Sequence, residues 1–215
     1  MFESETTATG NGEVGERVVP SGGGRLRIVT AEREPRRPDV TTAELVGGFE
    51  KRDLVLADYD AQWSDAYLEH ERRIRTALGS AAVQIEHIGS TSVPRLAAKP
   101  IIDVLITVDD ITAEEDYLDQ LLDAGYELRV REPSHRMVRT PARDVHVHVL
   151  EVGDQAAHDY LLLRDHLRAD PDDRYLYERT KRALLDQDWA DMNAYAEAKT
   201  EVITEIKERV RKSHA

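Results

Sequence analysis

Cysteine is the first absence, because the 215-residue sequence contains none. Disulfides, thiolate metal sites and a cysteine nucleophile are therefore excluded. No apolar run approaches the roughly 20 residues that a helix needs to cross a bilayer. The first residues, Met1 to Glu5, lack the basic and apolar regions of a signal peptide. We therefore expect a cytoplasmic protein without a membrane partner.

Positive charge is also scarce. The chain has 29 Lys and Arg against 42 Asp and Glu, which gives a net charge of −13. This excess opposes binding to nucleic acid, which needs a basic surface, so no DNA partner is expected. A single cleft can still be basic. Hydrophobic residues make up 40% of the chain, enough for the core of one domain.

The first 46 residues have the composition of a tail. Their apolar residues are too few to offset the entropy lost when a chain becomes ordered. We therefore predict a disordered N-terminal tail over residues 1–46, with a short strand over 25–29 as the alternative, and a folded domain over 47–215. Glycine and proline cluster in the tail at Gly10, Gly12, Gly15, Gly22, Gly23, Gly24, Pro20, Pro35 and Pro38.

Beyond the tail, hydrophobic periodicity predicts an α+β fold. Residues 101–108 form a nearly continuous apolar run, which is typical of a strand that is buried on both faces. Thr112 and Glu115 are placed as a capping box, and Gly125 as the end of that helix. The expected helices cover residues 63–78, 112–124, 155–168, 171–185 and 191–211, and the expected strands cover 83–88, 101–108, 126–130, 136–140 and 144–150. This order predicts a small mixed sheet with flanking helices and a helical C-terminal third.

The most informative segment follows the strand over residues 83–88. Gly89 allows the backbone to approach a ligand, and the hydroxyls of Ser90, Thr91 and Ser92 could bind a phosphate. Asp103 lies on the next strand, where its carboxylate could hold Mg²⁺ or another divalent metal against phosphate oxygens. Alternatively, Asp103 is a buried carboxylate that pairs with Lys99, Arg136 or a loop N–H, because an unpaired buried charge is costly. Lys99 is the cation expected in the pocket.

Two histidines share one face of the last strand. In the segment VHVHV, His146 and His148 alternate with three valines, so the histidines point to one side and the valines to the other. Such a pair could ligate a metal, contact phosphate or act as a general base. The alternative is a solvated sheet face without a role. Asp103, His146 and His148 are the catalytic candidates, with Asp103 and His148 as metal ligands, whereas His87 and His135 are interpreted as structural.

The helical third carries many cations. Tyr195 and Lys199, four residues apart on the expected helix, are candidate phosphate contacts. For most of the others, ordinary ion pairing on helix surfaces is the favoured interpretation. The other cations are Arg164, Arg168, Arg174, Lys181 and Arg182. The aromatic residues Trp63, Tyr160, Tyr175 and Trp189 are interpreted as packing residues.

The segment HIGSTSVPRLAAKPIID, residues 87–103, resembles the signature of the GrpB family. The segments LRDHLR (163–168) and YAEAK (195–199) resemble it as well, and the likeness extends over residues 55–210. The family belongs to the nucleotidyltransferase-like superfamily, and its members occur alone or fused to dephospho-CoA kinase. The resemblance implies a nucleotide or phosphorylated small molecule as ligand, and transfer of a nucleotidyl group with a divalent metal.

One departure from the superfamily pattern matters for the chemistry. That pattern has two alternating carboxylates on the strand after the Gly-Ser turn and a third on a later strand, but Leu105 occupies the second position and His146 and His148 stand in place of the third. Two-metal transfer relies on carboxylates that bridge both ions. The alternatives are therefore a catalytically degenerate module that binds a nucleotide, a coenzyme or a partner, and a metal-dependent hydrolase built on the histidine pair.

Overall fold

The computed structural model describes residues 16–21, 25–30, 43–48, 55–185, 187, 189, 194 and 197–213. The chain divides into two compact units, residues 1–36 and 37–215. In the first unit, β1 (Glu16–Ser21) pairs antiparallel with β2 (Arg25–Thr30). The remainder of the expected tail lies outside the described residues, apart from residues 43–46. The predicted domain boundary at residue 47 stays a prediction.

The second unit is built on a mixed six-stranded sheet in the order β3-β6-β7-β8-β5-β4. The neighbouring strands β8 and β5 are parallel to each other, and the other neighbours pair antiparallel. The α+β prediction is therefore confirmed. The strands are β3 (Glu44–Leu45), β4 (Gln84–Ile88), β5 (Ile102–Val108), β6 (Glu127–Glu132), β7 (His135–Arg139) and β8 (Val145–Glu151).

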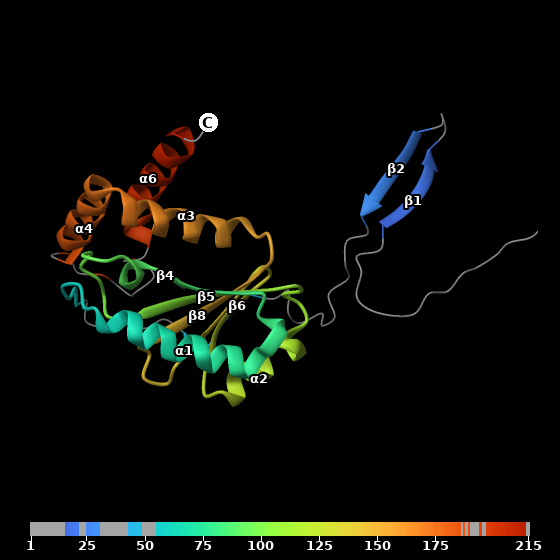
Figure 1. Ribbon diagram of the computed structural model, residues 1–215, viewed down its shortest axis with the longest axis horizontal. Helices are drawn as coiled ribbons and strands as arrows, with labels where there is room; N and C mark the ends of the chain where they lie inside the picture. The colour runs from blue at the N-terminus through green and yellow to red at the C-terminus, as the bar shows by residue number, and fades with distance from the viewer. Residues whose placement is uncertain are drawn as a thin grey trace, which may run out of the picture. The chain divides into compact units, whose positions relative to one another are not determined.

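Helices lie on both faces of this sheet (Figure 1). On one face, α1 (Gln62–Leu78) and α2 (Leu118–Asp123) pack against the main hydrophobic core, to which β5 and β8 contribute alternate valines and isoleucines. On the other face, α3 (Gln155–Ala169) packs through Ala157 against Leu105 and Leu150. The face under α3 is the one that carries the polar residues of β5 and β8.

The C-terminal third is helical, as expected. The helices α4 (Pro171–Leu185) and α6 (Thr200–Ser213) pack with α3 around a second apolar cluster that includes Leu167, Tyr177 and Ile206. Asp170 Oδ1 accepts hydrogen bonds from the backbone N–H groups of residues 172 and 173, which fixes the start of α4. No helix in the part of the chain that the structure describes is long and apolar enough to span a membrane.

The predicted helix over residues 112–124 is wrong in its first half. The segment forms a 3₁₀ turn at Glu114–Asp116, and α2 begins only at Leu118. Thr112 does not form the capping box, because its N–H and hydroxyl both donate to Asp110 Oδ1, at 2.9 and 2.6 Å. The predicted end is confirmed, since Gly125 adopts a φ of +91°.

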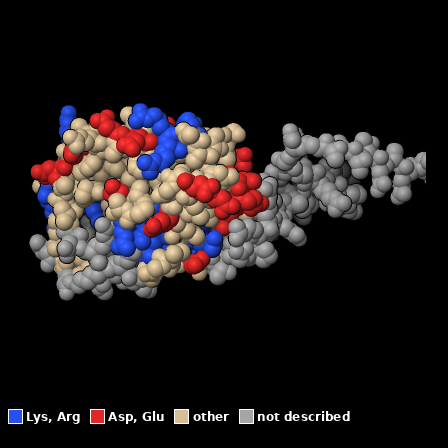
Figure 2. All heavy atoms as spheres, turned by 90° about the horizontal axis from the view of Figure 1, so that it is seen from below, with Lys and Arg blue, Asp and Glu red and all other residues tan. Residues whose placement is uncertain are grey.

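Among the described residues of the second unit, the surface has hollows at two places of note. One, of about 560 Å³, lies between α1 and α2 and is lined in part by Arg72, Arg73 and Asp123. Figure 2 shows that Lys and Arg residues (blue) are interspersed with Asp and Glu residues (red) on the face that it presents. The other hollow, of about 480 Å³, is lined by Pro94, Arg95, Arg168, Ala169, Pro171 and Arg174. The first lies on the face of the sheet opposite the polar residues of β5 and β8.

Lys181 is buried rather than part of a surface ion pair, so the interpretation from the sequence is wrong for this residue. Its Nζ donates to the carbonyl of Ala97 at 2.5 Å and lies 4.7 Å from the centre of the Tyr177 ring. Glu178, one turn earlier, accepts the N–H of Ala97 at 3.1 Å. The helix α4 therefore holds both backbone polar groups of Ala97, in the loop that leads from the Gly-Ser turn to β5.

Lys181 should make the free energy of unfolding depend on pH. Burial, reinforced by the charge of Lys199, lowers the pKa of Lys181 from 10.5 to about 7. Between these values the unfolded chain holds a proton that the folded chain lacks, so stability rises with pH across this window. Relative to Lys181→Met, the wild type should gain up to about 1 kcal/mol per pH unit between pH 7 and pH 10.

Urea unfolding of both proteins at several pH values measures this difference. Lys212→Met, which changes an exposed lysine of α6, is the matched control and should leave the pH profile of the wild type unchanged. Parallel profiles for the wild type and Lys181→Met would contradict the expectation.

Candidate functional site

The Gly-Ser turn closes directly on Asp103. Gly89 has a φ of +70°, a backbone conformation that residues with a side chain rarely adopt. A Cβ at this position would lie 3.1 Å from both Cβ and Cγ of Asp103 and closer still to Oδ2. The absence of a side chain at Gly89 therefore lets the turn approach the carboxylate.

Two of the three hydroxyls in the turn bond to nearby backbone. Ser92 Oγ donates to the carbonyl of Gly89 at 2.6 Å, and Thr91 Oγ1 donates to the carbonyl of Ile101 at 3.0 Å. Both side chains are buried, and Ser90 is half-buried. Thr91 and Ser92 therefore shape the turn, and the predicted contacts of these hydroxyls with phosphate stay predictions.

The helix α3 holds the turn from outside. The guanidinium of Arg168 donates to the carbonyl of Ser92 at 2.9 and 3.0 Å. Arg164 donates to the carbonyl of His87 at 3.1 Å and pairs with Glu86 at 2.7 Å. These arginines, interpreted from the sequence as surface ion pairs, connect α3 to the turn and to β4.

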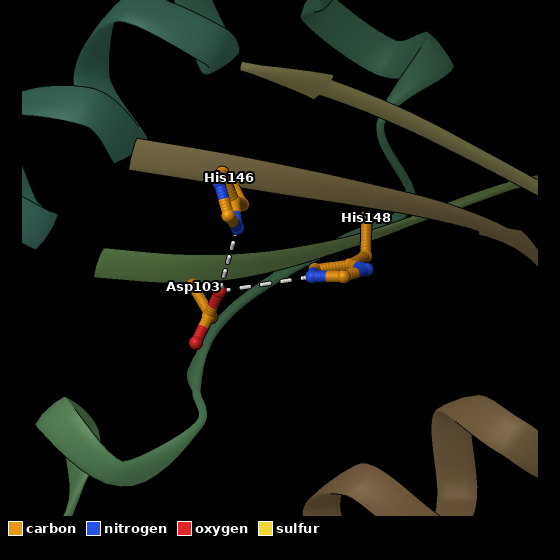
Figure 3. A group of neighbouring side chains, drawn as sticks. All are labelled: Asp103, His146 and His148. Carbon is orange, nitrogen blue, oxygen red and sulfur yellow. Dashed lines mark ion pairs between the residues drawn. The ribbon is translucent and has the colours of Figure 1, made fainter. Parts of the chain in front are cut away.

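Asp103, His146 and His148 meet on the sheet face under α3. In the parallel pairing of β5 and β8, Asp103 lies opposite His146, and Leu105 lies opposite His148. Asp103 Oδ1 is 3.5 Å from His146 Nδ1 and 3.7 Å from His148 Nε2, and both rings point toward the carboxylate (Figure 3). The predicted alternation is confirmed, because Val145, Val147 and Val149 are buried on the other face. The three polar side chains keep 16–27% of their surface exposed.

The two histidines set the charge of Asp103. Burial alone would raise the pKa of the Asp103 carboxyl, but the proximity of His146 and His148 outweighs it and holds that pKa well below its usual range. The alternative partner Arg136 is wrong, because this arginine pairs with Glu114 at 2.6 Å. Asp103 is therefore anionic at neutral pH.

A second layer of side chains, which the sequence did not predict, surrounds His148. His135 Nε2 lies 3.1 Å from His148 Nδ1, and His135 Nδ1 lies 3.1 Å from Glu132 Oε2. Burial and the neighbouring His148 lower the pKa of His135. From α3, the ring of Tyr160 lies 5.6 Å from that of His148, so Tyr160 also belongs to the surroundings of this site.

Of the predicted cations, Lys199 has the clearest link to the site. Burial lowers the pKa of Lys199, and the charge of Asp103 partly opposes this effect, so the two groups are within electrostatic reach. Lys99 is half-buried next to the bridge between Ala57 and Ala98, and its predicted place in the pocket stays a prediction. Tyr195 lies outside the described residues.

A mixed sheet with helices on both faces, and a Gly-Ser turn beside a carboxylate–histidine cluster, defines an α+β protein with a polar site on its one parallel strand pair, β5 and β8. A family model described as GrpB protein matches residues 53–209. The chain therefore belongs to the GrpB family, and the resemblance inferred from residues 87–103 is confirmed.

Three of the similar proteins differ in how much of their own length the likeness covers. The UPF0157 protein SCO7215 of Streptomyces coelicolor is 67% identical over 174 residues, which cover 81% of this chain and 93% of that protein. A dephospho-CoA kinase of Mycolicibacterium paratuberculosis is 30% identical over 169 residues, which cover 65% of this chain and 42% of that protein. The crystal structure of the conserved protein GrpB from Enterococcus faecalis is 28% identical and covers 74% of this chain and 99% of that chain, with a TM-score of 0.66.

Proposed function

We propose that this chain is a nucleotidyltransferase-like protein that binds a nucleotide or a phosphorylated small molecule together with a divalent cation. The observation that supports this proposal is the meeting of Asp103, His146 and His148, whose ligand atoms all lie within 4.8 Å of one another. The turn at Gly89 lies close to Asp103, because Gly89 has no side chain that would meet its carboxylate.

Each group has a role in this proposal. Asp103 and the two histidines hold the cation, which when bound neutralises phosphate charge. The backbone of the turn at Gly89 and Ser90 contacts phosphate oxygens, because glycine-rich turns present their N–H groups to anions. Lys199 adds positive charge from the C-terminal third. A histidine that is not bound to the cation would be free to act as a base.

Binding measurements test this proposal. By calorimetry with a panel of nucleoside triphosphates, we expect the wild type to bind in the presence of a divalent cation, and Asp103→Ala to lose at least about tenfold in affinity. The control is Asp119→Ala, because Asp119 is an exposed residue of α2 on the other side of the sheet. The proposal fails if the wild type binds no member of the panel, or if Asp103→Ala binds as tightly as the wild type.

A second candidate function is binding without turnover. Leu105, at the position of the second carboxylate in the superfamily pattern, is fully buried against Ile88, Leu150 and Ala157. An acid at this position would be an unpaired charge in an apolar cluster, so the packing opposes a second metal-binding carboxylate here. The likeness to part of a dephospho-CoA kinase makes coenzyme-type ligands worth adding to the panel. Tight binding with no product formed from any ligand would favour this function over transfer.

A further inference from the structure

The donor atoms of the Asp103 cluster are unusual for magnesium. The cluster offers one carboxylate oxygen and two imidazole nitrogens. Mg²⁺ takes oxygen ligands in a strict octahedral geometry, whereas imidazole nitrogen suits zinc, copper, iron and nickel. The donor set therefore favours a transition metal over the Mg²⁺ expected from the sequence.

The spacing of the cluster points in the same direction. The two nitrogen-to-oxygen distances, 3.5 and 3.7 Å, exceed the roughly 2.7–2.9 Å of a charge-assisted hydrogen bond. Two ligand atoms that each lie about 2.0–2.1 Å from a tetrahedral ion are about 3.3 Å apart. The two ion pairs therefore have nearly the spacing of ligand atoms around a tetrahedral ion.

A chain of contacts from Glu132 sets the orientation of His148. The Glu132 carboxylate only accepts hydrogen bonds, so the Nδ1 of His135 is the donor across their 3.1 Å contact. The Nε2 of His135 lies 3.1 Å from the Nδ1 of His148, within reach of a hydrogen bond that His148 would donate. With a cation bound, that arrangement would leave the Nε2 of His148, 3.7 Å from Asp103 Oδ1, to ligate the ion. Carboxylate–histidine contacts of this kind fix metal-ligating imidazoles.

The chain of contacts is itself anchored in the core. Arg136, which is fully buried, donates to the backbone carbonyls of Glu132 and His135. Its Nε donates to Glu114 at 2.6 Å. The turn between β6 and β7 is therefore held rigidly, and the imidazole of His135 is held with it.

We propose that Asp103, His146 and His148 form a three-ligand site for a transition metal of the Zn²⁺ type, and that His135 and Glu132 are its positioning residues. The inference rests on the proposed function, whose cation it identifies by class. Three protein ligands leave further coordination positions open, as in catalytic zinc sites. A phosphate oxygen of the bound ligand is the group that would take such a position.

Metal binding without any nucleotide tests the inference. Metal-stripped full-length protein is dialysed separately against Zn²⁺, Mn²⁺ and Mg²⁺, and the bound metal is measured by mass spectrometry. We expect one Zn²⁺ per chain, weaker binding of Mn²⁺, following the general order of affinities for nitrogen and oxygen sites, and Mg²⁺ weaker than Zn²⁺ by at least about 100-fold. His146→Ala should abolish Zn²⁺ binding at this site.

The positioning residues have their own readout. His135→Ala should weaken Zn²⁺ binding by about 10–100-fold, and His135→Gln, which keeps an acceptor for His148 Nδ1, should restore part of the affinity. A purely structural role would lower the thermal stability of the metal-free protein in both variants without this difference in affinity. His166→Ala, in the second His–Asp cluster with Asp170 and Asp173, is the control and should bind Zn²⁺ as the wild type does.

The outcomes separate the inference from the proposed function. If Mg²⁺ binds as tightly as Zn²⁺, or if His146→Ala binds Zn²⁺ unchanged, the transition-metal site is wrong, whatever nucleotides do. If Zn²⁺ binds as expected but no member of the nucleotide panel does, the metal site stands and the proposed function falls. Equal affinities of His135→Ala and the wild type would overturn the positioning role alone.

Discussion

Alanine in place of Gly89 should damage the site and the fold together. We expect Gly89→Ala to lower the free energy of unfolding by about 2–6 kcal/mol, of which about 1–3 come from the backbone conformation at φ +70° and ψ −175° and about 1–3 from overpacking. The added Cβ would overlap the Asp103 carboxylate, with Cβ and Cγ only 3.1 Å away. Displacing this carboxylate should also abolish cation binding, which dialysis measures alongside chemical denaturation.

Gly48→Ala is the matched control for this prediction. Gly48 has nearly the same φ, +68°, but among the residues that the structure describes, its two chain neighbours apart, no atom lies within 4 Å of the position that its Cβ would take. This variant should therefore lose only the backbone contribution, about 1–3 kcal/mol, and bind the cation normally. Equal losses of stability in the two variants, or normal cation binding by Gly89→Ala, would show that the contact with Asp103 is unimportant.

Local signals in the sequence predicted most elements of the fold. The apolar run of β5 identifies a strand with neighbours and helices on both sides, because only such a strand buries both faces. Asp170 and Pro171 mark the start of α4 through a cap and a fixed backbone angle, and both the start and the end of that helix were predicted correctly.

The errors arise where tertiary contacts compete with local preferences. Thr112 has the chemistry of an N-cap, but Asp110, two residues earlier, accepts both of its donors. Glu114 is held by Arg131 and Arg136 from β6 and β7, so the first turn of the expected helix takes a 3₁₀ form. The burial of Lys181 depends in the same way on a loop more than 80 residues away.

In the candidate site, too, local patterns predicted the individual residues, whereas tertiary contacts decide how they meet. The alternation of VHVHV placed His146 and His148 on one face, and the Gly-Ser signature singled out Asp103. Their meeting depends on the parallel register of β5 and β8, which no local pattern specifies. His135 was missed because it looked isolated. In the β7–β8 hairpin, Met137 pairs with His148, so a residue two positions earlier on the same face is its diagonal neighbour.

The second large effect concerns the ion pairs between Glu114 and the β6–β7 hairpin. Glu114→Gln should lower the free energy of unfolding at pH 7 by about 3–5 kcal/mol, because removing one partner of a buried pair leaves the other charge uncompensated. Glu114 and Arg136 are both fully buried and lie 2.6 Å apart, and Arg131 Nε lies 2.9 Å from the same carboxylate oxygen. Denaturation by urea measures the loss.

The pH dependence of the free energy of unfolding shows whether Glu114→Gln acts by removing a charge or by disturbing the packing. Burial would raise the pKa of Glu114, but Arg131 and Arg136 outweigh it and hold that pKa below 4.5. The ionised carboxylate therefore contributes stability above about pH 4.5, and this contribution is lost as the pH falls through the lowered pKa. Glu114→Gln should be least stable relative to the wild type at neutral pH, and the difference in the free energy of unfolding between the two proteins should narrow on acidification.

Glu115→Gln, at an exposed neighbouring position, is the control and should change the free energy of unfolding by no more than about 0.5 kcal/mol. A gap between Glu114→Gln and the wild type that stays constant with pH would mean that the amide disturbs packing, and that the charge of Glu114 does not stabilise the β6–β7 hairpin.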